Sequence, residues 1–91
     1  MHERPIKRIY YSSKFEKALG KMPQFVKRAF IKRGKLFLSN AFHPSLDAHP
    51  LHGKYMGFWS FTVIGQYRVM FAFRDSHYAD FVNIGTHEIY R

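Results

Sequence analysis

Three segments rich in aromatic and β-branched residues follow one another toward the C-terminal end of the chain, with short breaks at Gly65-Gln66 and around Asp75-Ser76-His77. Such segments are typical of β-strands, and we expect strands at about 57–64, 67–74 and 79–85. The first break is only Gly65-Gln66, and a connection this short joins strands as an antiparallel hairpin. This part of the chain therefore predicts an antiparallel sheet.

The register of the first hairpin decides which side chains share a face of that sheet. A one-residue slip would move every side chain to the other face, so the register that keeps the aromatic residues together should win. That register requires an odd loop or a bulge near Gly65. We expect Val82 and Ile84 on the aromatic core face. The other face stays open, with Arg68 at its centre and His87 near its rim.

A strand and a helix are expected at the N-terminal end. Residues 6–11 (IKRIYY) are short, β-branched and aromatic, which favours a strand. Ser12 and Ser13 offer an N-cap, and Glu16 stands at the capping-box spacing from Ser13. Apolar residues then recur at helical spacing from Phe15 onward, which predicts one buried helix face.

A second helix follows the first after a tight break. Gly20 and Pro23 end the first helix, and Pro23 can also begin the second, which we expect to reach about Ser39. Two consecutive helices with a short break form a helical hairpin. Residues 40–53 contain two prolines and several turn residues, so we expect a loop there.

The expected order of elements is βααβββ. We therefore expect an α+β fold in which the helical hairpin packs on one face of a mostly antiparallel four-stranded sheet. The 91 residues should form a single domain, residues 1–91, with a short arm at 1–5. The 10 Phe, 6 Tyr and 1 Trp supply a dense core for so short a chain.

The charge is strongly positive, with 15 Lys+Arg against 6 Asp+Glu and a formal net charge of +9. This imbalance indicates a polyanionic partner, which can be nucleic acid, a membrane surface or an acidic protein. The alternative is a solvated basic helix face. The second expected helix carries five candidate nucleic-acid-binding residues, Lys27, Arg28, Lys32, Arg33 and Lys35.

The absence of cysteine excludes a disulfide framework and zinc sites built on cysteine, and it fits a reducing compartment. The first residues hold no apolar segment typical of a signal peptide, and no apolar run approaches the length of a membrane span. We therefore expect a cytoplasmic protein with no membrane association. His43, His49 and His52 lack the spacing of a zinc site, so we expect no metal.

The segments "HPLHGK", "WSF…QYRVMF" and "IGTHEIY", in this order, resemble the RelE/ParE toxin superfamily over about residues 6–90. These proteins are the toxins of bacterial type II toxin–antitoxin pairs. The resemblance implies an antitoxin that wraps the toxin in a hetero-oligomer. RelE-, YafQ- and HigB-like members cut mRNA, usually on the ribosome, whereas ParE-like members inhibit DNA gyrase without nuclease chemistry.

The resemblance also assigns the candidate catalytic residues. Arg68 matches the strand arginine that lies near the scissile phosphate in RelE-like nucleases. His49 and His87 match the two active-site histidines of YafQ-like members, and Tyr90 matches an aromatic residue that closes these sites. Three further residues are candidate nucleic-acid contacts, Lys54, His52 and Arg74.

These residue types suit RNA cleavage without a metal or other cofactor. Such cleavage needs a base for the ribose 2′-OH, a cation for the charge on phosphorus and an acid for the leaving 5′-oxygen. Histidine can serve as acid or base near neutral pH, and arginine fits phosphate geometry. We expect His87 as acid or base and Arg68 as the phosphate clamp, with products that carry 2′,3′-cyclic phosphates. Alternatively, Arg68 forms a structural ion pair with Asp75, Asp80 or Glu88.

The chain departs from the nuclease pattern at several positions. Thr62 stands where HigB- and YafQ-like nucleases usually carry Arg or His, and Gln66 stands where YafQ-like members have an aspartate. Trp59 and Phe61 occupy the places of the RelE-type lysine pair. Two alternatives to an mRNA endoribonuclease therefore stay open. One is a ParE-like gyrase inhibitor, and the other is a non-toxic family member that acts as a binding module.

Overall fold

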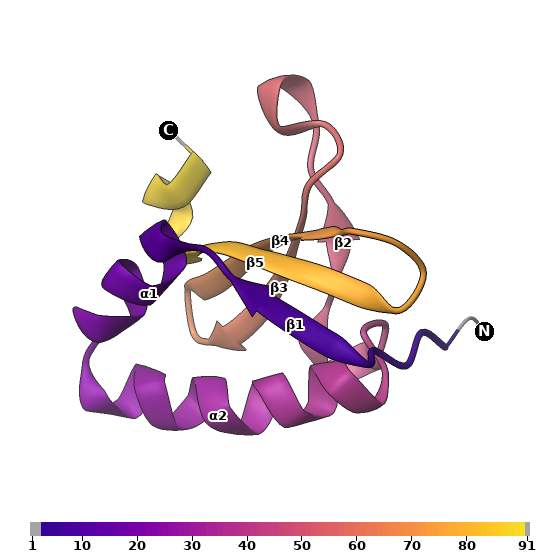
Figure 1. The fold of residues 1–91 in the computed structure, drawn as a ribbon. Coiled ribbons are helices and arrows are strands. Elements are labelled where there is room, and N and C mark those ends of the chain that lie inside the picture. Colours follow the sequence, from indigo (N-terminus) through magenta and orange to yellow (C-terminus); the bar gives the residue numbers. More distant parts are fainter. Residues whose placement is uncertain (1–2, 91) are drawn as a thin grey trace.

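The computed structural model describes residues 3–90, so the start of the predicted arm at 1–5 lies outside the described residues (Figure 1). The helices and strands follow the chain in this order: β1 (Arg8–Tyr11), α1 (Ser13–Gly20), α2 (Gln24–Ser39), β2 (His49–Pro50), β3 (Trp59–Ile64), β4 (Tyr67–Phe73) and β5 (Tyr78–Gly85). Three short 3₁₀ turns complete the fold, η1 (Pro44–Leu46), η2 (Gly53–Tyr55) and η3 (His87–Tyr90).

The strands form one sheet in the order β1-β5-β4-β3-β2, and only β1 and β5 are parallel neighbours. The predicted α+β fold, with a helical hairpin against a mostly antiparallel sheet, is confirmed (Figure 1). The sheet has five strands instead of the four expected. The additional strand β2 is two residues long and contains Pro50, which an edge strand tolerates because one side needs no ladder hydrogen bonds.

A bulge sets the register of the β3–β4 hairpin. Thr62 pairs with Arg68 and Ile64 pairs with Tyr67, so Val63 is the extra residue between them. The predicted bulge near Gly65 is thereby confirmed. It keeps the aromatic side chains of the two strands on the core face and leaves Thr62 and Arg68 together on the opposite one.

A second bulge lies in β5. Asn83 pairs with Met70, whereas Phe81 pairs with Phe71, so Val82 is the extra residue. Phe81 and Ile84 belong to the core, and Val82 borders a hollow on the other face together with Asn83. The prediction that Val82 faces the helices was wrong, because the bulge turns two successive side chains to the same face.

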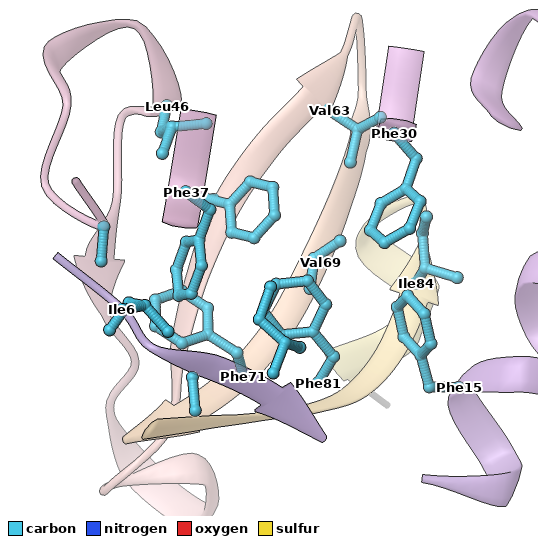
Figure 2. Packing of buried hydrophobic residues seen from close by; sticks show 14 of the residues in the cluster. Ile6, Phe15, Phe30, Phe37, Leu46, Val63, Val69, Phe71, Phe81 and Ile84 are labelled. Carbon is cyan, nitrogen blue, oxygen red and sulfur yellow. The ribbon is translucent and has the colours of Figure 1, made fainter. Parts of the chain in front are cut away.

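Phenylalanines from both layers form the core (Figure 2). The ring of Phe37 in α2 lies 4.9–5.3 Å from the rings of Phe61, Phe71 and Phe81, one on each of three strands. Each fully buried phenylalanine contributes about 1.5–3 kcal/mol to folding. These contacts fix α2 across the sheet.

Ser12 fixes the start of α1. Its side-chain oxygen accepts a hydrogen bond from the Phe15 N–H at 3.0 Å, so Ser12 is the N-cap. The predicted capping box between Ser13 and Glu16 was wrong, since Ser13 is already the first helical residue. The Ser12 hydroxyl also donates to the Val82 carbonyl at 3.2 Å, and this bond ties α1 to the bulge of β5.

Candidate functional site

The outer face of the sheet, which we define as the face turned away from the helices, carries Arg68. Arg68 is the second residue of β4, where it pairs with Thr62 in β3 and Gly85 in β5. It therefore lies on the middle strand of the sheet, at the hairpin end of that strand, so the predicted central position holds across the sheet and not along the strand. Met70, two residues further along β4, lies between these strands and is only 4% exposed.

Two turns cover Met70, so the outer face is not fully open. In Figure 1, η3 and the loop that contains η2 both lie on the side of the sheet away from α2. Tyr55 of η2 and Ile89 of η3 border the same hollow as Met70. The rings of Tyr55 and Tyr90 also contact each other at 6.3 Å between centroids. Tyr90 is thus brought to the outer face by η3 and held beside η2.

The Arg68 guanidinium is bound to the backbone of its own hairpin. Its Nη1 donates to the Gly65 carbonyl at 2.9 Å and to the Tyr67 carbonyl at 3.4 Å. The alternative of an ion pair with a carboxylate was wrong, because the only ion pair within residues 3–90 joins Arg74 and Asp80. The Nε and Nη2 donors of Arg68 make no hydrogen bond to the described residues, so they are available to an anion.

His49 begins β2 and lies over Ser60 of β3. Its Nδ1 lies 2.9 Å from the carbonyl oxygen of Asp47, so the Nδ1–H donates a hydrogen bond to that oxygen. Its Nε2 lies 3.4 Å from the Ser60 hydroxyl. A neutral ring that donates from Nδ1 keeps its lone pair on Nε2. Ser60 is fully buried on the outer face. Sequence reasoning did not single it out, although a serine between Trp59 and Phe61 was the available signal.

His87 is the first residue of η3 and is exposed. It follows Gly85 by two residues, and Gly85 is the register partner of Arg68. The connection from Gly85 to His87 is short, so His87 lies near the end of the sheet that carries Arg68. His49 reaches the same face from the other side of Met70, because Ser60 pairs with both His49 and Met70.

Two of the candidate nucleic-acid-binding arginines are engaged within the fold. Arg74 donates to both carboxylate oxygens of Asp80, at 2.6 and 3.2 Å, and lies 3.9 Å from the centroid of Tyr10. The hydrogen bond from Arg74 to Asp80 raises the pKa of Arg74. Arg33 donates from Nε to the Val63 carbonyl at 3.1 Å and from Nη1 to Ser45. It therefore holds the β3 bulge and the η1 turn against α2.

The other candidate nucleic-acid-binding residues divide between the two sides of the molecule. Lys54 and His52 lie in or next to η2, and the Lys54 Nζ is 5.2 Å from the Tyr55 ring centroid. The remaining four lie on α2, which covers the opposite face of the sheet (Figure 1): Lys27, Arg28, Lys32 and Lys35. The helix cations and the candidate catalytic residues are thus separated by the sheet.

Within residues 3–90, the histidines and carboxylates form no group of three that could hold a metal ion. The same residues include no helix with the length and apolar character needed to cross a bilayer.

No protein-family model and no curated protein matches the chain. Solved structures do match it. A YoeB/ParE toxin from Agrobacterium tumefaciens is 12% identical, with a TM-score of 0.74 over 88% of this chain and 98% of that one. This chain has the RelE/ParE toxin fold. Two complexes with the same fold are similar to it. The RelE–RelB complex from Pyrococcus horikoshii matches at 18% identity and a TM-score of 0.70, over 87% of this chain and 92% of that one. The E. coli DinJ–YafQ complex matches at 22% identity and a TM-score of 0.62, over 92% and 97%.

Proposed function

We propose that this protein is the toxin of a type II toxin–antitoxin pair and that it cleaves mRNA, on the ribosome, without a metal ion. The observation that supports this proposal most is that Arg68 pairs with Gly85, two residues before the η3 turn that begins at His87. The RelE/ParE fold supports the toxin role.

The proposed reaction uses only side chains of this chain. A histidine, His87 or His49, takes the proton of the ribose 2′-OH, and the 2′-oxygen bonds to phosphorus. The bond from phosphorus to the 5′-oxygen breaks, and an acid protonates that oxygen. The products are a 2′,3′-cyclic phosphate and a 5′-hydroxyl. The free donors of Arg68 would hold the phosphate as negative charge develops on it, and Tyr90 would stack on a base or orient the phosphate.

Thr62 favours a second candidate function. It pairs directly with Arg68 on the outer face, at the position where the nucleases that the chain resembles usually carry Arg or His. A threonine supplies neither a cation nor an effective base there. A ParE-like toxin that inhibits gyrase without nuclease chemistry, or a non-toxic binding module, would not need either.

We also infer a cognate antitoxin and a cytoplasmic location. The similar structures include RelE with RelB and YafQ with DinJ, which supports a protein partner. Exposed apolar side chains of α2 also suit a partner, with Phe25 at 53% and Ile31 at 59% exposure. The antitoxin inference is tested by co-expression with the product of the adjacent gene, which should form a stable complex and suppress toxicity.

Growth arrest in cells tests the nuclease role. Arg68→Ala together with His87→Ala should abolish toxicity if the protein remains soluble and folded. Arg28→Ala on the far side of the molecule is the matched control and should remain toxic. Toxicity that survives the double substitution would contradict the assignment of these residues. Inhibition of DNA supercoiling by the purified protein would then establish the ParE-like alternative.

A further inference from the structure

A row of three lysines, two in α1 and one at its C-cap, is not used by the proposed mechanism. Lys14, Lys17 and Lys21 are separated by three and four residues, so they share one helix face, and all three are exposed. They border a hollow of about 480 Å³ together with Asn83 of β5. At 1.5 Å of rise per residue, the row extends about 10 Å along the helix.

The β5 bulge connects this row with the candidate catalytic face. Asn83 borders the lysine hollow, a second hollow under Tyr55 and Met70, and a third beside Gly85 and Thr86. The three hollows therefore adjoin at Asn83. The third one reaches the residues immediately before His87. The hydrogen bonds of Ser12 to Phe81 and Val82 hold α1 in this position.

Asn83 presents a hydrogen-bond donor at the junction. Its Oδ1 accepts from the Ile84 N–H at 2.9 Å, and this bond orients the amide group. The Nδ2 donor makes no hydrogen bond to residues 3–90 and can therefore serve a ligand that carries acceptors.

The charges around the row are not neutralised within the described chain. The three lysines take part in no ion pair there. The carboxylate of Glu88 borders the hollow beside Gly85 and repels anions there. The hollow beside the three lysines is therefore the more favourable place for an anion. On the other side of the molecule, Arg28 and Lys32 border an apolar groove with Phe25 and Ile64 instead.

We propose that Lys14, Lys17 and Lys21 form a track for an RNA phosphodiester backbone that leads past Asn83 to the Arg68 and His87 end of the outer face. This inference rests on the proposed function and names the part of the protein that holds its substrate. Lysines supply the phosphate contacts, and the Asn83 amide donates to a base or phosphate. The α2 cations, which the sequence indicated for this role, lie on the wrong side of the sheet to guide RNA to these residues.

The test measures binding of a fluorescein-labelled single-stranded 2′-O-methyl RNA, which lacks the 2′-OH needed for cleavage, as a function of salt. The test variant is Lys14→Gln/Lys17→Gln/Lys21→Gln. The control is Arg28→Gln/Lys32→Gln/Lys35→Gln on α2, which removes the same three positive charges. Each phosphate contact with a single strand contributes about 0.7 to the slope of log K against log salt, so the α1 variant should lose about 2 from this slope. The α2 control should keep most of it.

Equal losses in the two triple variants, or no loss in the α1 variant, would overturn the track. The track would also be overturned if poly-L-glutamate displaced the labelled RNA as effectively as unlabelled RNA does, because the lysine row would then fit an acidic protein segment. Binding of both triple variants to ribosomes without mRNA is measured in parallel. A loss of binding confined to the α1 variant, with either the single-stranded RNA or the ribosome, supports the track.

Glutamine is a suitable replacement because its helix propensity is nearly that of lysine. If the triple variant does not fold, the single variant Lys17→Gln is used instead. Because binding is measured without cleavage, failure of the nuclease proposal is distinguished from failure of the track.

Discussion

The ring of Phe37 contacts β3, β4 and β5 at once, through Phe61, Phe71 and Phe81. Phe37→Ala should lower the free energy of unfolding by about 3–5 kcal/mol, because it leaves a cavity where α2 meets the sheet. Urea denaturation measures this value. The control Phe25→Ala, at a side chain that is 53% exposed, should cost less than about 1 kcal/mol. Equal costs at the two positions would contradict the described core.

Gly85 is tightly packed against η3. A Cβ atom at this position would lie 2.7 Å from the Cγ2 of Ile89, so one of the two must move. Gly85→Ala should displace η3, which carries His87 and Tyr90, and reduce RNA cleavage more than it reduces stability. The double variant Gly85→Ala/Ile89→Ala removes the clash and should recover part of the activity. If Gly85→Ala alone cleaves RNA at the normal rate, the position of η3 does not matter for the reaction.

At the level of elements, the attachment of α1 to β5 depends on Ser12. Ser12→Ala removes both the N-cap and the bond to the Val82 carbonyl, and it should cost about 1 kcal/mol or more of unfolding free energy. Ser13→Ala is the control and should be nearly neutral. Thermal or urea unfolding measures both. A larger cost at Ser13 would instead support the capping box with Glu16.

The elements were largely predictable from the sequence because their signals were local. Gly20 and Pro23 mark the break between the helices, and the alternation from Trp59 onward fixes the register of β3 and β4. The β5 bulge was not predictable. In a regular strand, residues 79 and 81 would point to one face and residues 82 and 84 to the other. All four are apolar, so a strand with a bulge and a strand without one both bury apolar side chains, and the sequence does not distinguish them.

The candidate site was predictable only in part. The sequence indicated that Arg68 lies on the face opposite the aromatic core, and the register of β3 and β4 agrees with this. The cover over Met70 could not be predicted, because it arises where η2 and η3, far apart in the sequence, meet through Tyr55 and Tyr90. The hydrogen bond of Arg68 to the Gly65 carbonyl likewise depends on the bulged turn.

At the scale of the whole molecule, the two layers separate two kinds of surface. The helix layer presents Phe25 and Ile31 among cations, which suits a protein partner with acidic and apolar groups. The outer face of the sheet presents Arg68 and His49, with His87 in the turn at its Arg68 end, and the lysine row borders this face. Under the proposed function, the positive charge that gives the formal +9 is divided between two surfaces, and we expect RNA binding and antitoxin binding to respond to different substitutions.

Cleavage of mRNA on programmed ribosomes tests the central claim most directly. The purified protein is added to ribosomes that carry a defined mRNA, with and without a metal-specific chelator at constant free magnesium, and the RNA ends are mapped. We predict discrete cuts with 2′,3′-cyclic phosphate ends that the chelator does not change and that Arg68→Ala and His87→Ala remove. An absence of cuts with a folded, monodisperse sample would contradict the account, and Thr62 beside Arg68 would then be the physical reason.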